Sequence, residues 1–72
     1  MTAEELENAF TYHKPIGDQP ERYEKIRNAA KELAYLIFES CPESRERSIA
    51  FTRLRDVAMW ANASIACNEL EV

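Results

Sequence analysis

The chain has 72 residues, a formal net charge of −4 and a pI near 4.9. A chain of this length forms one domain, residues 1–72, and buries too little surface to be comfortably stable alone, which favours an oligomer. The acidic balance disfavours nonspecific binding to DNA or RNA duplexes, because neutralisation of phosphate charge dominates that affinity.

The features that reflect cellular compartment indicate the cytoplasm. The first residues are acidic and lack the apolar core of a signal peptide, and no apolar run approaches membrane-spanning length. His13 is the single histidine, and Cys41 and Cys67 are the two cysteines, so no Cys/His metal site is expected. Unpaired cysteines are typical of a reducing cytoplasm. The sequence therefore predicts a cytoplasmic protein with no metal, no cofactor and no membrane partner.

A short helix is predicted over residues 2–9. Thr2 is suited to cap it, and Glu5, three residues later, completes a capping box. Helices this short are marginal in water, so this one needs a surface to lie on. Leu6 and Phe10 stand four residues apart and share an edge, which predicts a docked N-terminal arm.

Residues 11–17 form a predicted elbow that contains the single glycine of the chain. Pro15 biases Lys14 towards an extended backbone. Gly17 then permits a sharp bend, because glycine tolerates positive φ. The elbow is expected to be rigid and to lead directly into a helix.

The first long helix is predicted over residues 19 to about 40. Asp18 is expected to cap it, with Pro20 in the first turn, where no backbone donor is needed, and Glu21 three residues after the cap. The helix ends before Pro42, because proline cannot occupy a helix interior.

The second long helix is predicted over residues 45 to about 69, after the tight connection 41–44. Ser44 can cap it, or Cys41 can if Pro42 lies in its first turn. A connection this short makes the two helices antiparallel neighbours, so the fold class is all-α, a helical hairpin preceded by a short helix. The hairpin separates Cys41 from Cys67 by about 35–40 Å, which excludes a disulfide between them.

Each long helix carries more apolar surface than one contact buries. One seam follows helical spacing on both helices and closes the hairpin; it comprises Ile26, Ala30, Leu33, Ile37, Phe51, Leu54, Ala58, Ala61 and Ile65. A second face carries Leu36, Phe38 and Trp60, which a monomer exposes. Large exposed apolar patches usually mark interfaces, so we expect the chain to assemble as a homo-oligomer.

Two carboxylate patterns allow an enzyme hypothesis. All-helical nucleotide pyrophosphohydrolases hold magnesium with Glu-x-x-Glu pairs, and this chain has Glu21/Glu24 and Glu43/Glu46. Both pairs lie in first helical turns, where acidic residues complement the helix dipole, and that role accounts for them. His13 has no serine or cysteine nucleophile at a credible position. We therefore predict no catalytic residues and no enzymatic activity.

The basic residues fall into two groups. Those of the second helix alternate with carboxylates, and Glu43 and Arg47 stand four apart, so a solvated, salt-bridged face is expected there. The second group flanks the elbow together with aromatic rings and consists of Tyr12, His13, Lys14, Arg22, Tyr23, Lys25 and Arg27.

A ring beside a guanidinium group matches what a nucleobase and its phosphate require, a stacking plane and a forked donor. The elbow is therefore a candidate nucleotide site. The alternative is that Tyr12 packs at an interface and that Arg27 pairs with Glu24.

Three separated blocks carry a family resemblance. They are Phe10-Thr-Tyr-His-Lys-Pro with Gly17-Asp-Gln-Pro-Glu-Arg-Tyr, then Cys41-Pro-Glu-Ser-Arg-Glu-Arg-Ser, then Met59-Trp-Ala-Asn-Ala-Ser-Ile-Ala. In this order they resemble the phage anti-CBASS protein 2 family, which is related to a Thoeris anti-defence family. The resemblance implies a helical hairpin that forms compact hexamers in the host bacterial cytoplasm and sequesters cyclic di- and trinucleotide messengers without cleaving them.

The resemblance also implies roles for individual residues. Tyr12 matches the family's tyrosine that stacks on a base of a cyclic dinucleotide. Arg27, or else Lys25, matches a basic residue that contacts phosphate. The family carries a basic residue near the end of the second helix, where this chain has Cys67 and Asn68; Asn68 is the expected hydrogen-bonding group there. His13 and Lys14 complete the predicted ligand site.

Two other functions remain open at this stage. Trp60 and Phe38 suit a helical module that binds a host or phage protein. The relation to the Thoeris anti-defence family suits a sponge for cyclic ADP-ribose-type signals.

Overall fold

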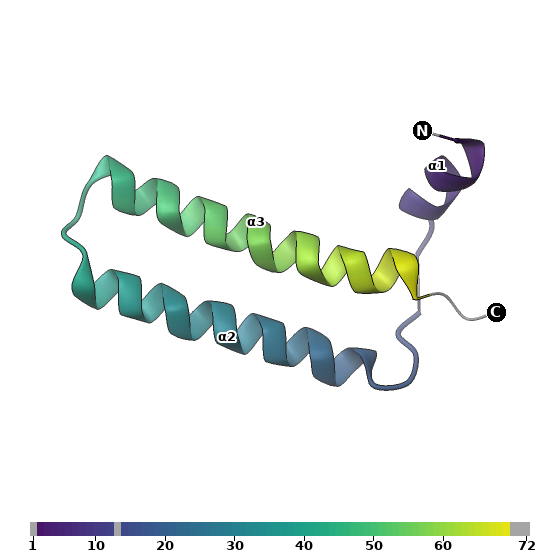
Figure 1. Ribbon diagram of the computed structural model, residues 1–72, viewed down its shortest axis with the longest axis horizontal. Helices are drawn as coiled ribbons and strands as arrows, with labels where there is room; N and C mark the ends of the chain where they lie inside the picture. The colour runs from purple at the N-terminus through teal and green to yellow at the C-terminus, as the bar shows by residue number, and fades with distance from the viewer. Residues whose placement is uncertain (1, 13, 70–72) are drawn as a thin grey trace.

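The computed structural model describes residues 2–12 and 14–69, and every regular element among them is a helix. Helix α1 spans Ala3–Ala9, α2 spans Gln19–Ser40 and α3 spans Arg45–Asn68. Helices α2 and α3 lie side by side and antiparallel, joined by a short turn at one end (Figure 1). The predicted all-α hairpin and its helix boundaries are confirmed.

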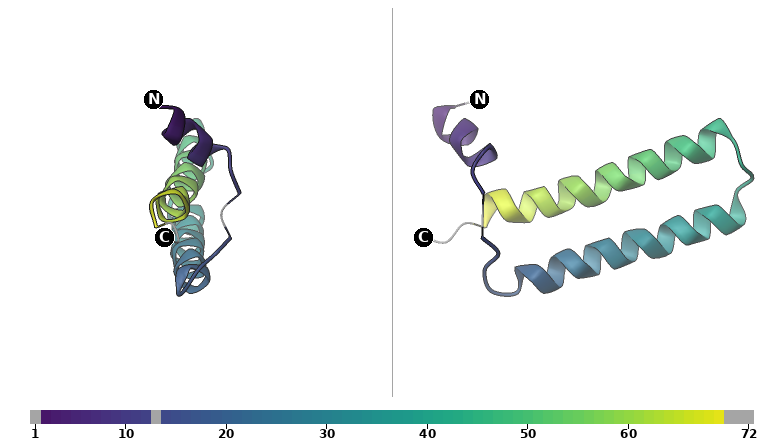
Figure 2. Two further views of the ribbon diagram at one scale, coloured as in Figure 1. Left: turned by 90° about the vertical axis from the view of Figure 1, so that its right-hand side faces the viewer. Right: turned by 180° about the vertical axis from the view of Figure 1, so that it is seen from behind.

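Helix α1 is held by its own cap and projects from the open end of the hairpin, as both views in Figure 2 show. The Thr2 hydroxyl accepts a hydrogen bond from the Glu5 amide at 3.1 Å, and the Glu5 carboxylate accepts one from the Thr2 amide at 3.3 Å. The predicted capping box is therefore confirmed. The Asn8 side chain ties α1 to α3 by donating to the Cys67 carbonyl at 2.7 Å.

The bend before α2 forms as predicted, but the predicted capping hydrogen bond does not. Gly17 has φ +55°, and the Gln19 amide donates to the Ile16 carbonyl at 3.0 Å, which closes the turn. Asp18 occupies the predicted cap position, but its side chain makes no capping hydrogen bond. Its backbone (φ −89°, ψ 9°) is not in the extended conformation usual at a cap, and its carboxylate instead lies 3.2 Å from Nε of Arg22.

Ser44 caps α3, which decides between the two predicted caps. Its backbone is extended, and its hydroxyl accepts a hydrogen bond from the Arg47 amide at 3.1 Å. Helix α2 ends at Ser40, two residues before Pro42. The connection is short enough that α3 can only return alongside α2.

The predicted pair of Glu43 and Arg47 was wrong. The Arg47 guanidinium lies over the rings of Phe38 and Phe51, with its central carbon 5.1 Å and 5.7 Å from their centroids. It also donates to the Cys41 carbonyl at 3.2 Å. The turn brings two rings and free carbonyls within reach of one side chain, and together they outcompete a single solvated carboxylate.

A single chain buries no apolar side chain fully among the described residues. The seam residues are half-buried at best, and Leu33 on the same seam is exposed. Trp60 is 68% exposed, and Leu36 and Phe38 are exposed as well. The second apolar face is thus open to solvent in one chain, as the sequence predicted.

Two further sequence expectations concern the cysteines and the membrane. Cys41 follows the end of α2 and Cys67 lies in the last turn of α3, and both are free thiols. Among the described helices, none combines the length and the apolar character that crossing a bilayer requires.

Candidate functional site

The elbow between α1 and α2 presents two aromatic rings to solvent. Tyr12 is 84% exposed and Phe10 is 85% exposed. The Thr11 hydroxyl donates to the Glu7 carbonyl at 2.6 Å, which continues the last turn of α1 into the elbow. Lys14 is also exposed, while His13 lies outside the described residues. The elbow therefore offers flat rings beside a cation, with no neighbouring element covering them.

Three polar residues, Gln19, Arg22 and Glu69, connect the start of α2 to the end of α3; we call them the polar clasp. Arg22 binds the Glu69 carboxylate through both terminal nitrogens, with Nη1 2.9 Å from Oε2 and Nη2 on Oε1. The Gln19 side chain donates to the Glu69 carbonyl at 3.1 Å and accepts from the Ile16 amide at 3.0 Å. Gln19 is the one buried residue of the described chain.

The clasp changes the protonation behaviour of its two charged members. Hydrogen bonding to Arg22 lowers the pKa of Glu69, although partial desolvation opposes the change. The same contact raises the pKa of Arg22 further above its already high ordinary value. Arg22 flanks the elbow in the sequence, but Glu69 and Asp18 occupy it in the fold. It is therefore not available as a phosphate donor while the clasp is closed.

Arg27 lies in a groove between α2 and α3, which we call the cationic groove. Arg27 and Lys31 come from α2, and Arg55 comes from α3. Their side chains border an apolar floor made by Ala30, Ala34, Phe51, Leu54 and Ala58. No carboxylate is among the residues that line this groove, and none of the ion pairs between described side chains involves its three cations.

The alternative pairing of Arg27 with Glu24 is not present among the described residues. Lys25 is exposed on α2 and does not line the cationic groove. Of the two residues weighed for phosphate contact, Arg27 is thus the one that borders the cationic groove.

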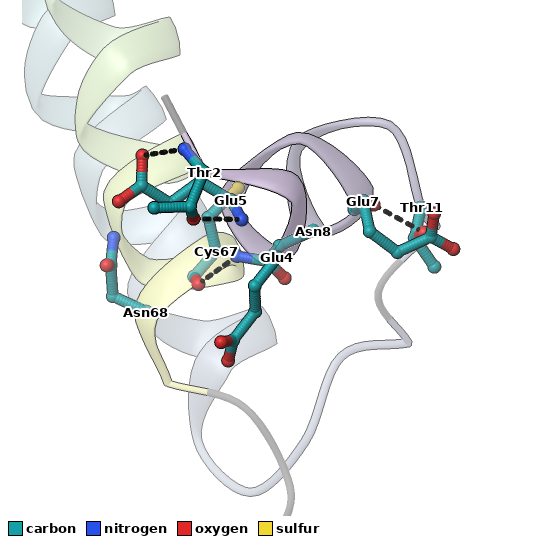
Figure 3. Close-up of a pocket in the computed structure, with 8 residues that line it drawn as sticks. All are labelled: Thr2, Glu4, Glu5, Glu7, Asn8, Thr11, Cys67 and Asn68. Carbon is teal, nitrogen blue, oxygen red and sulfur yellow. Dashed lines mark hydrogen bonds between the residues drawn. The ribbon is translucent and has the colours of Figure 1, made fainter.

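A second hollow, which we call the acidic cavity, lies between α1 and the end of α3. Figure 3 shows Cys67 and Asn68, from the end of α3, beside the glutamates of α1. The cavity is lined by Glu4, Glu5 and Glu7, among others, and by no basic residue. The Asn68 side chain donates to the Ser64 carbonyl at 2.9 Å, one turn earlier in α3. Within one chain, Asn68 therefore faces carboxylates that repel phosphate.

A family model described as "Acb2/Tad1, hairpin domain" matches residues 2–66. The chain belongs to this family. No curated protein and no solved structure matches the chain. The match agrees with the resemblance carried by the elbow, the turn and the last part of α3, and it covers α1, α2 and α3 up to residue 66.

Membership in the Acb2/Tad1 hairpin family places the chain among phage anti-defence proteins, whose members sequester nucleotide signals.

The two principal ligand contacts predicted from the sequence, Tyr12 and Arg27, are not brought together within one chain. Tyr12 lies on the elbow, whereas Arg27 lies about 12 Å along the axis from the start of α2. None of the hollows described above is lined by both side chains.

Sequence reasoning missed the clasp and the cationic groove. Glu69 is 47 residues from Arg22, and no local spacing signals a pair at that separation. Lys31 and Arg55 were available as basic residues, but Arg55 was assigned to a salt-bridged face of the second helix. The groove could have been predicted only from the register in which α2 packs against α3, because that register places Arg55 opposite Arg27 and Lys31.

The carboxylate pairs of the enzyme hypothesis stay apart from both hollows. Glu21, Glu24, Glu43 and Glu46 are all exposed on the surface of the helices. Within residues 2–12 and 14–69, no group of three His, Cys, Asp or Glu side chains is arranged to hold a metal ion.

Proposed function

We propose that this Acb2/Tad1 hairpin protein is a phage immune-evasion protein that sequesters cyclic di- and trinucleotide messengers of bacterial CBASS defence. The observation that carries the proposal is the family match over residues 2–66. Two features of the fold support it: an exposed stacking ring at Tyr12 and a cationic groove that contains Arg27. The proposed place of action is the cytoplasm of the host bacterium, where such messengers are made.

The proposed cyclic dinucleotide site is shared between two subunits. Tyr12 and Arg27 line no common hollow in one chain, but the exposed elbow of one copy can reach the groove of another. A two-fold interface presents each residue twice, so one ring meets each base and one guanidinium meets each phosphate. Lys25, Lys14 and His13 are proposed as secondary contacts around this pair. Asn68 is proposed to hydrogen-bond the ligand in place of the family's basic residue.

The proposed assembly is a homohexamer. A single chain leaves Trp60, Leu36 and Phe38 exposed and buries no apolar side chain fully among its described residues. Burial of apolar area contributes about 25 cal/mol per Å², so covering this second face stabilises the hairpin. Sedimentation at micromolar concentration tests the assembly, and a monomer would contradict both the hexamer and the shared site.

The decisive test measures affinity for cyclic dinucleotides by calorimetry. Stacking contributes roughly 1–3 kcal/mol per base and a charge-assisted hydrogen bond about 1.5–3 kcal/mol. Each substitution removes two copies of its group, so Tyr12→Ala and Arg27→Ala should each weaken binding at least about a hundredfold, or about 2.7 kcal/mol. Arg53→Ala is the matched control, since Arg53 pairs with Asp56 and lines neither hollow.

The result of that test distinguishes an error in the assigned site residues from an error in the proposed function. Both variants should keep the oligomeric state of the parent, because neither residue belongs to the second apolar face of Leu36, Phe38 and Trp60 that is proposed to hold the assembly. If both bind cyclic dinucleotides as tightly as the parent does, Tyr12 and Arg27 are not the site.

Sequestration without cleavage is tested by recovery of the ligand. A cyclic nucleotide incubated with the protein and released by heating should have its original mass. A linear product would instead indicate hydrolysis, and Glu21 and Glu24 would then be the candidate magnesium-binding pair.

Two observations favour other functions, a sponge for a different nucleotide and a protein-binding module, and the same calorimetry distinguishes them from the proposed one. The Thoeris-related part of the family name favours a cyclic ADP-ribose-type ligand, so such a compound belongs in the panel beside cyclic di- and trinucleotides. The exposed Trp60 and Phe38 favour a protein-binding module. A chain that binds no nucleotide and forms a one-to-one complex with a partner protein would support that module.

A further inference from the structure

We infer that the cationic groove is a phosphate-binding site in which Lys31 and Arg55 act together with Arg27 on a cyclic dinucleotide. This inference rests on the proposed function, and it assigns two ligand contacts beyond Tyr12 and Arg27. The aliphatic stems of three cations from two helices border the groove, whose lining is almost wholly apolar, and no carboxylate lines it.

The charges of the groove are unbalanced in a chain that is acidic as a whole. Arg27 and Lys31 stand four residues apart on α2, where like charges destabilise a helix. Arg55 brings a third positive charge from the facing helix to the same groove. The net charge is −4, yet no described carboxylate forms an ion pair with any of these three. An anionic ligand with more than one phosphate relieves this repulsion.

Three other cations of the described chain are engaged, whereas Lys14, Lys25 and Arg45 form none of the ion pairs between described side chains. Arg22 binds Glu69 and Asp18, Arg53 lies 3.8 Å from Asp56, and Arg47 lies over two aromatic rings. The groove cations therefore differ from these engaged cations in what surrounds them rather than in residue type. Among the described hollows, the groove is the one bordered by three such cations from two helices, and this convergence supports it as the place for phosphate.

The floor of the groove suits the uncharged part of a nucleotide. Small alanine side chains keep it open, and Phe51 and Leu54 supply an apolar surface. A third hollow, distinct from the acidic cavity, adjoins the groove and shares Lys31, Ala34 and Phe51 with it. It continues towards the turn along Tyr35 and Phe38. A base can thus lie against apolar and aromatic side chains while its phosphates meet the cations at the rim.

The test compares three glutamine variants by calorimetry with cyclic di-AMP and cyclic GMP–AMP. Lys31→Gln and Arg55→Gln remove a charge and keep most of the side-chain stem. Each should weaken binding at least about tenfold, the effect of losing one charge-assisted contact. Arg53→Gln is the control on the same helix as Arg55; it should change the dissociation constant less than about threefold.

Sedimentation of the same variants distinguishes a ligand site from an interface. The inference requires weaker binding with the oligomeric state of the parent retained. If loss of binding accompanies dissociation of the oligomer, the groove holds a second copy of the chain, and the inference is overturned.

The remaining outcomes separate this inference from the proposed function. If Arg27→Ala weakens binding while Lys31→Gln and Arg55→Gln bind like the parent, the groove assignment fails and the proposed function stands. If the parent binds neither cyclic dinucleotide, both fail.

Discussion

The acidic cavity and the cationic groove are two hollows of one small hairpin with opposite charge. The cavity is lined by the glutamates Glu4, Glu5 and Glu7, and the groove by Arg27, Lys31 and Arg55. Helix α3 contributes to both, with its last residues at the cavity and its middle at the groove. A net charge of −4 for the chain is therefore compatible with a local hollow bordered by three cations.

Because the two hollows carry opposite charge, we expect the local lining rather than the net charge of the chain to decide where an anion binds. Interactions between exposed charges fall off over about 10 Å at 0.1 M salt, so each hollow acts through its own lining. A phosphate near the groove meets cations at close range, while the glutamates of α1 are screened. The following experiments change one hollow at a time.

The largest expected effect comes from reversing one charge in the groove. Arg27→Glu replaces a phosphate contact by repulsion, and we expect the affinity for a cyclic dinucleotide to fall by about a thousandfold or more, about 4 kcal/mol. Glu4→Lys makes an equally large charge change in the cavity and should alter the affinity less than about threefold. Calorimetry on both variants measures the contrast, and equal losses would show that overall charge matters rather than position.

A smaller effect is expected from salt. Raising the ionic strength from about 0.1 M to about 1 M shortens the Debye length from about 10 Å to about 3 Å and should weaken binding by the parent about tenfold. Tyr12→Ala should show the same dependence, because it keeps its charges. Arg27→Ala should respond less, since it has lost its phosphate contact. A parallel response of all three would place the phosphate elsewhere.

Removing the cap of α1 alters the cavity and leaves the groove intact. Thr2→Ala breaks the capping box, which stabilises the helix by about 1 kcal/mol, so α1 should fray. Circular dichroism should report a small loss of helicity, and calorimetry should report an affinity within about threefold of the parent. A large loss of affinity would mean that α1 positions the elbow for the ligand.

The smallest effect concerns the clasp and its dependence on pH. Arg22 lowers the pKa of Glu69 below its ordinary value of 4.5, so folding favours the carboxylate. The resulting stabilisation is complete above that ordinary value and is lost as the pH falls through the lowered pKa. Glu69→Gln should therefore lower the thermal midpoint by a few degrees near pH 7, a modest shift because the pair is partly exposed.

The same variant should match the parent at strongly acidic pH, because the parent's carboxylate is then protonated as well. Thermal unfolding followed by circular dichroism at both pH values measures the difference. A gap between the two proteins that persists at low pH would show that Glu69 acts through packing rather than charge.

Elements that are fixed by contacts between near neighbours could be predicted from the sequence. Thr2 with Glu5, Ser44 before Arg47, and Pro42 after α2 fix helix ends through contacts within four residues. Gly17 fixes the bend, because positive φ suits glycine. The helical spacing of apolar residues on α2 and α3, together with the short turn between them, then predicts an antiparallel hairpin. The exposed Tyr12 at the elbow is a local feature of the same kind.

Contacts between charged groups that are distant in the sequence, such as Arg22 and Glu69, depend on how the helices pack. Arg47 read as a partner of Glu43 but lies over two rings, and one of them, Phe38, belongs to the facing helix α2. The fold brings Phe38 near, and the two rings together outcompete the local carboxylate. The convergence of Arg27 and Lys31 with Arg55 depends on the register of α2 against α3, which no spacing along one helix encodes. Local spacing decides which groups share a helix face, but contacts between distant residues depend on how the faces meet.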